Sequence, residues 1–365
     1  MILGHHYQQD DVIQHADFVG DSLKLSQIAQ AKSPQRGTEF IVFCGVHFMA
    51  ETADLLTEPG VRVILPDLGA GCSMADMAAY DDAVDAWSCI SNAVAGESTR
   101  VIPVTYVNSS AAIKAFVGQH GGACCTSSNA KQVFDWALAG GDTPKRCNEK
   151  IKLFFLPDQH LGRNTAHARG MVTELDARES KAKSAQTAVW DPRKEHGGLS
   201  PEAIRAVDVI LWAGHCSVHK LFRAEHVDAV RDRKDGTQVL VHPECSQDVV
   251  DAADLVGSTE FIIQTIAQAA IGSSFAVGTE VHLVTRLARA AAERGVTVDM
   301  LSGCQCLCTT MYRIDQPHLA WVLDQLAAGR VVNEIRVHDA ARGAARLALD
   351  RMLMNVAVKP LALVD

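Results

Sequence analysis

The chain has 365 residues and a formal net charge of −9, and 48% of its residues are hydrophobic while 21% are charged. At about 100 to 200 residues per domain, this length suggests roughly two to three domains. The acidic balance and the absence of long Lys/Arg runs exclude a typical nucleic-acid-binding protein. The longest apolar runs are far shorter than the roughly 20 residues that span a bilayer. We therefore expect a soluble globular protein with neither nucleic-acid nor membrane partners.

The N-terminus, MILGHHYQQDD, lacks the basic start, apolar stretch and cleavage site of a signal peptide. We therefore expect a cytoplasmic protein. The sequence contains eleven cysteines. In a reducing compartment, so many cysteines indicate free thiols, metal ligands or catalysis rather than a disulfide framework.

Short apolar runs alternate with helix-like segments along the chain. Runs rich in Val, Ile and Leu at this length are typical of buried strands in parallel sheets. Between them, residues 228–236 and 281–295 have the apolar spacing and closing glycine of amphipathic helices, and residues 341–356 show a helical pattern near the C-terminus. The predicted class is α/β. The strand candidates are residues 39–45, 61–67, 101–107, 151–157, 207–214, 237–243 and 273–279.

Polar residues capable of chemistry follow the strand candidates repeatedly. Ligands bind beyond the carboxyl ends of parallel strands, so we expect these tails to converge on one place. The charged segment from Thr173 to Ser200 is predicted to be a surface excursion without catalytic residues. The tails are GHHY, GVHF, DLGAGC, VNSS, DQHLG, GHC, HPEC, GTE and SGC.

Three cysteine segments combine glycine and cysteine after a strand candidate, as a shielded iron–sulfur site requires. They contain Cys72, Cys216 and the CxCxC run of Cys304, Cys306 and Cys308. Neither CxxC…CxxC nor CxxxCxxC spacing is present, so any ligands come from distant segments. One cysteine of the CxCxC run is expected to be a ligand, and the other two could form a disulfide that competes with it. The remaining candidates, which we interpret as inert thiols, are Cys44, Cys89, Cys124, Cys125 and Cys147.

Eleven motifs in order resemble the quinolinate synthase family over nearly the whole chain. They are GHHYQ, ADFVGDSL, PDLGAGCSMAD, YVNSS, CTSSNA, PDQHLG, GHCSVH, HPEC, VGSTEFI, GTE and CLCTTM. The resemblance implies three similar three-layer α/β sandwich domains with parallel sheets around a pseudo-threefold axis, with the active site at their junction. The implied domains are residues 1–95, completed by the C-terminal helices of 317–365, then 96–216 and 217–316.

The resemblance also implies the reaction and the cofactor. In this family iminoaspartate and dihydroxyacetone phosphate condense to quinolinate, with loss of phosphate and two waters, in NAD biosynthesis. One [4Fe-4S] cluster per chain would be held by Cys72, Cys216 and Cys308, the last because Thr309, Thr310 and Met311 follow it as in the family. Three ligands leave one iron open, and an open iron can act as a Lewis acid.

The acid–base and binding residues are carried over from the same motifs. Glu244 is the implied general acid–base, although a strand-end salt bridge is the alternative interpretation. The implied catalytic residues are Glu244, His242, Tyr7 and Tyr106. The implied substrate-binding residues are His5, Ser22, Asn108, Ser127 and Thr259, whose hydroxyl and amide groups suit anions at helix starts.

Three departures and several alternatives remain, and one departure is that the segment around Thr173 to Ser200 is longer than the family core requires. The chain begins almost at GHHY, so the first strand is expected to be truncated, and Ser217 stands where the family commonly has Pro. An aconitase-type hydro-lyase, a non-catalytic iron–sulfur or metal-sensing protein, and a zinc protein are the competing interpretations. The substrates are the expected partners, and a transient contact with an L-aspartate oxidase is a further expectation from the pathway.

Overall fold

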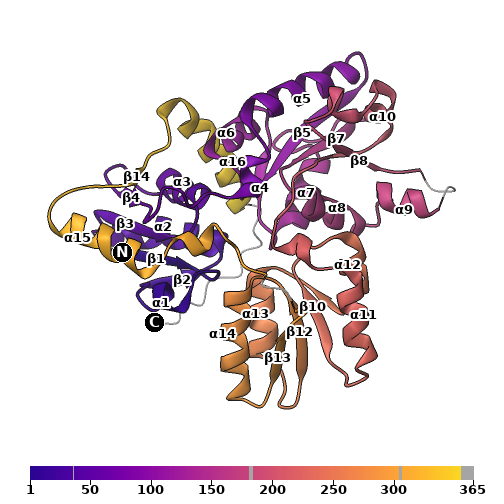
Figure 1. The fold of residues 1–365 in the computed structure, drawn as a ribbon. Coiled ribbons are helices and arrows are strands. Elements are labelled where there is room, and N and C mark those ends of the chain that lie inside the picture. The colour runs from indigo at the N-terminus through magenta and orange to yellow at the C-terminus, as the bar shows by residue number, and fades with distance from the viewer. Residues whose placement is uncertain (36, 181–183, 304–305, 355–365) are drawn as a thin grey trace.

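The computed structural model describes residues 1–35, 37–180, 184–303 and 306–354. Figure 1 shows three lobes, each built on its own β-sheet with helices packed against it. Every strand pairing is parallel except that between β14 and β4. The predicted α/β class with three similar parallel-sheet units is confirmed. None of the described helices is both long enough and apolar enough to cross a membrane.

The first sheet has the order β14-β4-β3-β1-β2. Strand β1 pairs with both β2 and β3, and its central Leu3 is fully buried, as are Ile41 and Phe43 of β3. The elements of this lobe are β1 (Ile2–His5), α1 (Asp10–Ile13), β2 (Phe18–Gly20), α2 (Ser22–Gln35), β3 (Phe40–Cys44), α3 (His47–Leu56), β4 (Arg62–Ile64), α4 (Ser73–Asp76), η3 (Met311–Arg313), α15 (Gln316–Ala327) and β14 (Glu334–Ile335).

The second sheet has the order β6-β5-β7-β9-β8. Strands β5 and β7 are nearly continuous apolar runs because both faces of the sheet are covered. The elements are α5 (Tyr80–Ala93), β5 (Thr99–Tyr106), α6 (Ala111–Gln119), β6 (Ala123–Cys125), α7 (Ala130–Leu138), β7 (Lys150–Leu156), α8 (Gln159–His167), α9 (Glu174–Glu179), β8 (Thr187–Trp190), η1 (Glu195–Gly198), α10 (Pro201–Ala206) and β9 (Val209–Trp212).

The prediction that residues Thr173 to Ser200 form only a surface excursion is wrong. Strand β8 lies within this segment and pairs with β9, and its Thr187 and Trp190 are buried. Thr173 caps the N-terminus of α9 through a reciprocal capping box with Asp176. The strand was not predicted because it is only four residues long and lies in a charged segment. Its apolar side chains nevertheless pack into the second lobe.

The third sheet has the order β11-β10-β12-β13. Helix α14 begins at Val281 and ends at Ala292, and the left-handed Gly295 closes it as its sequence predicts. The elements are η2 (His219–Leu221), α11 (Ala224–Asp232), β10 (Gln238–Val241), α12 (Gln247–Ala252), β11 (Leu255–Val256), α13 (Thr259–Ala267), β12 (Ser274–Gly278), α14 (Val281–Ala292) and β13 (Thr297–Met300). All seven predicted strands are present, as β3, β4, β5, β7, β9, β10 and β12.

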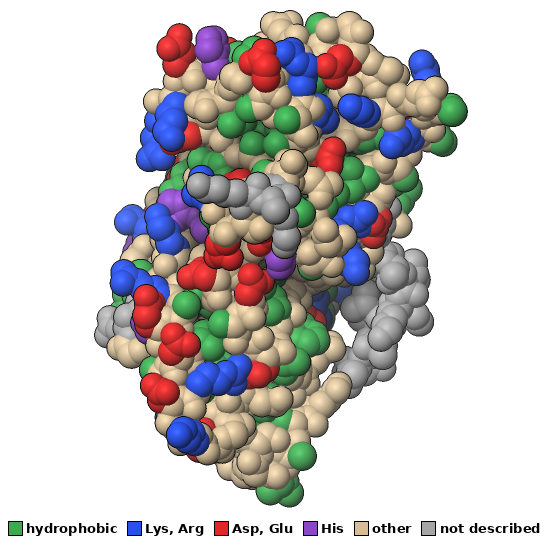
Figure 2. Space-filling model, turned by 90° about the vertical axis from the view of Figure 1, so that its right-hand side faces the viewer, with side chains coloured by type: hydrophobic (Ala, Val, Ile, Leu, Met, Phe, Trp, Pro, Cys, Tyr) green, Lys and Arg blue, Asp and Glu red, His purple; other side chains and the backbone are tan. Residues whose placement is uncertain are grey.

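The C-terminal segment is divided between two lobes. Strand β14 extends the first sheet, whereas α16 (Asp339–Met354) packs on α6 and β6 of the second lobe. The packing is close at Gly118, where an added Cβ would lie 1.9 Å from the Ala344 carbonyl oxygen. The predicted boundaries near residues 95, 216 and 316 remain predictions. Figure 2 shows one face of the molecule, where acidic, basic and hydrophobic side chains are interspersed.

Candidate active site

A cavity of about 70 Å³ lies where the three lobes meet, and all three contribute to its lining. The convergence follows from the sheets, because the polar tails of parallel strands lie at their carboxyl ends. All twelve residues proposed from the sequence line this one cavity, and their individual roles remain predictions. They are His5, Tyr7, Ser22, Cys72, Tyr106, Asn108, Ser127, Cys216, His242, Glu244, Thr259 and Cys308.

Short turns position the three cysteines, and Cys308 packs against the cores of both the first and the third lobe. Cys72 precedes α4, Cys216 follows β9, and Cys308 precedes η3. All five cysteines interpreted as inert are described, and none lines the cavity. Cys306 is buried in the core of the third lobe, so Cys308 is the described member of the CxCxC run that faces the cavity. The suggested disulfide involves Cys304, which lies outside the described residues.

The surroundings of the three thiols suit a bound cation better than free thiolates. Burial is the largest influence on all three, and it raises the pKa of Cys72 to about 12 and those of Cys216 and Cys308 above the usual value. Charge repulsion from Cys308 also raises the pKa of Cys72, and repulsion from Cys308 and Cys72 raises that of Cys216. Glu244 adds to the rise at both thiols. No Lys or Arg is present among the described residues that line the cavity. A positively charged metal centre would relieve this repulsion, so the donor set fits the implied cluster.

Backbone N–H groups near each cysteine oppose this rise. The N–H of the residue three positions later lowers the thiol pKa in every case. Hydrogen bonds to a ligand sulfur stabilise its thiolate form and tune a cluster. These residues are Ala75 for Cys72, His219 for Cys216 and Met311 for Cys308.

Glu244 is the centre of a buried hydrogen-bond network. The Tyr106 hydroxyl donates to its Oε1 at 2.7 Å, and His219 Nδ1 lies 3.0 Å from its Oε2. Burial raises the pKa of Glu244, but electrostatic interaction with the neighbouring rings of His219 and His242 and the hydrogen bonds from His219 and Tyr106 outweigh it and lower the pKa to about 2. His219 Nδ1 and Glu244 Oε2 lie within ion-pair distance, so the salt-bridge interpretation of Glu244 stays open beside the catalytic one.

The network continues from His219 to the first lobe. His219 Nε2 lies 3.1 Å from Thr279 Oγ1, and the Tyr7 hydroxyl lies 3.1 Å from both Thr279 Oγ1 and Thr259 Oγ1. Burial, followed by the charge of Glu244, raises the pKa of Tyr7 well above its usual value. An unbroken chain of hydrogen bonds therefore joins Tyr106 to Tyr7 through Glu244, His219 and Thr279.

The two predicted histidines are neutral in this environment. Burial is the main cause that lowers the pKa of His242 to about 3 and holds that of His5 well below its usual value. The backbone N–H groups of Glu244 and Tyr7 donate to Nδ1 of His242 and His5 respectively. Each ring therefore carries its proton on Nε2, which makes that nitrogen a hydrogen-bond donor.

Helix starts supply further groups for anions. Ser22 is the first residue of α2 and Thr259 is the first residue of α13, so both hydroxyls lie at positive helix ends. Ser127 lies shortly before α7. Asn108 Oδ1 is buried without a hydrogen-bond partner among the described residues, so a ligand could use this oxygen.

Sequence reasoning missed three residues that shape this site. His219 lies three positions after Cys216 in GHCSVH, and this ligand-like spacing was the available signal. Thr279 follows β12 in the GTE tail. Asn164, from α8, donates at 2.8 Å to both the Pro243 and Cys245 carbonyls and thus holds the backbone on either side of Glu244.

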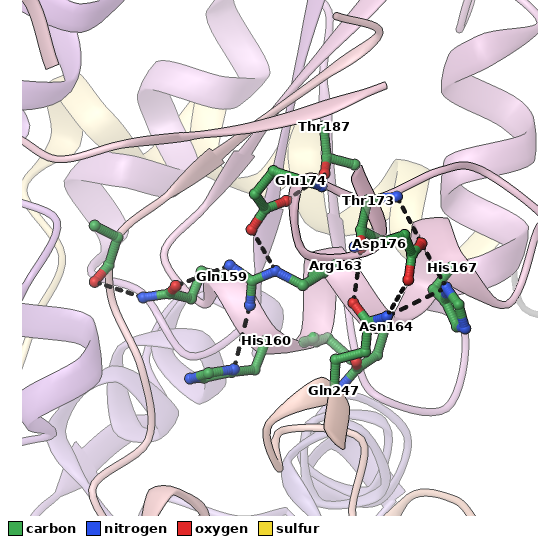
Figure 3. Close-up of polar contacts among 12 residues, drawn as sticks. Gln159, His160, Arg163, Asn164, His167, Thr173, Glu174, Asp176, Thr187 and Gln247 are labelled. Atoms are coloured by element: carbon green, nitrogen blue, oxygen red, sulfur yellow. Dashed lines mark hydrogen bonds and ion pairs between the residues drawn. The ribbon is translucent and has the colours of Figure 1, made fainter. Parts of the chain in front are cut away.

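Asn164 belongs to a wider contact between the second and third lobes. Figure 3 labels it among the polar residues that join α8 and α9 to Gln247 of α12. Gln247 Oε1 accepts from Thr173 Oγ1 at 2.9 Å, and its amide nitrogen donates to Asp176 at 2.8 Å. The position of the Glu244 segment thus depends on side chains of the neighbouring lobe.

The fold and the site define an α/β protein with a buried three-cysteine metal centre candidate beside a His–Glu–Tyr network. A family model described as quinolinate synthetase A protein matches residues 1–354. The chain therefore belongs to the quinolinate synthetase A family, and the resemblance noted in the sequence is confirmed.

Curated relatives agree with this assignment. The chain is 50% identical to the quinolinate synthase of Acidobacterium capsulatum, over 97% of this chain and 88% of that protein. It is 52% identical to the quinolinate synthase of Nocardioides sp., over 96% of this chain and 84% of that protein. It is 50% identical to the quinolinate synthase of Herpetosiphon aurantiacus, with coverage of 97% and 88%.

Proposed function

We propose that the chain is a quinolinate synthase of NAD biosynthesis that condenses iminoaspartate with dihydroxyacetone phosphate. The products are quinolinate, phosphate and two waters. The observation that carries this proposal is the arrangement of three thiols and the Glu244 network around one cavity, in a chain half identical to quinolinate synthases over nearly its whole length.

Cys72, Cys216 and Cys308 would hold a [4Fe-4S] cluster with one iron not ligated by protein. When bound, the cluster supplies a Lewis acid that polarises a substrate oxygen or nitrogen. Substrate reaching it would also contact Glu244 and His219, since the Cys216 sulfur and the nearest polar atoms of these two residues lie within 4.8 Å of one another.

Glu244 would act as the general acid–base. Its carboxylate is ionised and can accept a proton from a substrate carbon or water, as imine formation, proton shifts and two dehydrations require. The Tyr106 hydroxyl would hold the carboxylate in position, and the chain through His219 and Thr279 would carry protons towards Tyr7.

The binding groups would hold the anionic substrates without a lysine or arginine. The Nε2–H groups of His5 and His242 would donate to carboxylate or carbonyl oxygens. Ser22, Ser127 and Thr259 would donate hydroxyl hydrogen bonds near the starts of α2, α7 and α13. Exclusion of water from this small cavity would protect the unstable imine.

The test is an assay of quinolinate after anaerobic purification, with iron and sulfide analysis of the same sample. The expected result is about four irons per chain and quinolinate formed from dihydroxyacetone phosphate plus enzymatically generated iminoaspartate. A reconstituted protein that holds its cluster but makes no quinolinate contradicts the proposal. Activity on a hydroxy acid alone would instead support the aconitase-type hydro-lyase.

A mononuclear metal centre is the second candidate, because Cys216, His219 and Glu244 could together hold one divalent cation. Zinc without iron or sulfide in active protein would favour it. The proposed enzyme acts in the cytoplasm, and an L-aspartate oxidase would be its transient partner as the source of iminoaspartate. A pull-down with that oxidase tests this partner separately.

A further inference from the structure

A second cavity, of about 570 Å³, shares the segment of residues 213–220 with the first. This segment contributes Cys216, Val218 and His219 to the first cavity and Ala213, His215 and Lys220 to the second. The second cavity also lies at the carboxyl ends of β8 and β9, where Asp191 and Ala213 directly follow the strands. In parallel sheets this is where ligands bind.

The lining of this cavity has an excess of three positive charges, although the whole chain carries −9. Two of the five cations have a carboxylate partner at short range: Arg163 pairs with Glu174 at 2.6 Å, and Arg193 pairs with Asp191 at 2.8 Å. Figure 3 shows Arg163 directed towards Glu174, Gln159 and His160. The charged lining residues are Arg163, Arg178, Arg193, Lys194, Lys220, Glu174 and Asp191.

The remaining positive charge comes from separate segments. Arg178 lies on α9, Lys194 lies on the turn after β8 at 3.9 Å from Asp191, and Lys220 follows the cysteine segment. Lys220 Nζ lies 3.4 Å from His215 Nε2. The surrounding field is positive, because Arg163 and Lys220 add to burial in lowering the pKa of His160 to about 3.

The turn that carries Arg193 and Lys194 is held in shape by its own backbone. The Asp191 N–H donates to the Gly197 carbonyl at 3.0 Å, and the Gly197 N–H donates to the Lys194 carbonyl at 3.0 Å. Gly197 has a left-handed φ of 65°, and a Cβ there would lie 2.1 Å from the Trp190 ring. Only glycine fits this position, so the basic side chains are presented on a pre-formed wall.

We propose that the second cavity binds a small phosphate-bearing anion between α9, the turn after β8 and Lys220. Guanidinium groups match the oxygens of a tetrahedral oxyanion, and ammonium groups reaching it from other segments add charge. The bound anion would connect three segments, one of which carries Cys216 and His219. This site is separate from the groups that we assign to the reaction, so the proposal goes beyond the proposed function.

The test uses the intact holoprotein and isothermal titration with inorganic phosphate, pyrophosphate and succinate at low ionic strength, where charge attraction is least screened. The variant Arg178→Glu/Lys194→Glu removes two cations from the cavity. The matched control Arg233→Glu/Lys145→Glu makes the same change of charge at exposed positions outside it. Melting temperatures of all three proteins verify that they are folded.

We expect pyrophosphate affinity to fall about tenfold or more in the cavity variant and to stay within about twofold of wild type in the control. In wild type, pyrophosphate should slow hydrogen exchange in peptides that cover residues 190–198 and 213–220. An equal loss of pyrophosphate affinity in both variants would show that only the net charge of the protein matters, and it would overturn the proposal. Succinate binding as tight as pyrophosphate binding would overturn the assignment to phosphate.

Discussion

The two cavities on either side of residues 213–220 differ in the charge of the side chains that line them. Among the described lining residues, the first cavity has no Lys or Arg, and the second has five. The first measures about 70 Å³ and the second about 570 Å³. If both bind anions as we propose, the smaller cavity would use neutral donors and helix starts, whereas the larger one would use full charges.

The difference follows from the cost of burying charge. An unpaired cation in an enclosed apolar site loses much of its hydration, so a lysine or arginine there would need its own carboxylate. The first cavity instead has the neutral imidazoles of His5 and His242. Its one network carboxylate, Glu244, has His219 and Tyr106 as partners. A cation at this place is better supplied by a metal centre, because three thiols and a carboxylate surround it.

The largest expected effect is the loss of the metal centre. Cys308→Ser removes one of three sulfur donors, so we expect the protein to lose its iron and its quinolinate synthesis together. Iron and sulfide analysis beside the activity assay measures both. Cys147→Ser is the matched control, because Cys147 is exposed and does not line the cavity. Retention of a complete cluster in Cys308→Ser would show that this cysteine is not a ligand.

The next effect isolates the carboxylate of the first cavity. Glu244→Gln keeps the size of the side chain but removes its charge and proton-accepting oxygen, so we expect kcat to fall by about 10²- to 10⁴-fold with iron content unchanged. The control Glu225→Gln changes an exposed glutamate on α11. Full turnover in a cluster-loaded Glu244→Gln protein would exclude Glu244 as the acid–base. A protein without catalytic function would have no turnover to lose.

A smaller effect is expected where the neighbouring lobe positions Glu244. Asn164→Leu removes both hydrogen bonds to the Pro243 and Cys245 carbonyls, so Glu244 shifts relative to the substrate. We expect kcat to fall by about 10- to 100-fold with little change in KM, since binding groups stay in place. Steady-state kinetics measures the split. Asn92→Leu, at an exposed position of α5, is the control.

In Asn164→Leu, hydrogen exchange of the Glu244 and Cys245 amides should also become faster, and the change should be confined to this segment. A general loss of stability would instead speed exchange throughout the protein. A rise in KM with unchanged kcat would contradict a positioning role for Asn164.

The fold was predictable where the apolar signal is local. The seven predicted strands are continuous apolar runs because both faces of a parallel sheet are buried. Strand β8 was missed because charged residues surround its four residues, and only its pairing with β9 makes it a strand. Helix α16 was predicted as a helix, but its place on α6 depends on Gly118, far away in the sequence.

Most residues of the site could be predicted from the sequence, but the contacts between lobes that hold them could not. The tails of parallel strands were expected to converge, and the family resemblance supplied the individual residues, including Ser22 and Thr259, which no strand tail indicated. Contacts between lobes leave no local trace: Asn164 reaches Pro243 across 79 positions, and Tyr106 reaches Glu244 across 138. His219 was the exception, since its spacing from Cys216 was visible in the sequence.

The smallest expected effect is on the pH dependence of stability, and it concerns one buried histidine at each cavity. The pKa is lowered to about 3 for His242 in the first cavity and for His160 beside the second, with burial as the main cause. In the unfolded chain both titrate near 6.5. As the pH falls through 6.5, both histidines become protonated in the unfolded state but stay neutral in the folded state. The free energy of unfolding therefore falls. Glu244 adds nothing in this window, because its pKa is about 2 folded and its unfolded value is near 4.5.

We therefore expect the melting temperature to fall between pH 7.5 and 5.5, and to fall less steeply in His242→Asn and in His160→Asn. Scanning calorimetry at several pH values measures the slope, and His318→Asn, at an exposed position, is the control. Burial dominates at both places, so the two variants should flatten the slope by similar amounts, despite the different charges of the two cavities. A flatter slope in His160→Asn alone would mean that positive charge, and not burial, keeps these rings neutral.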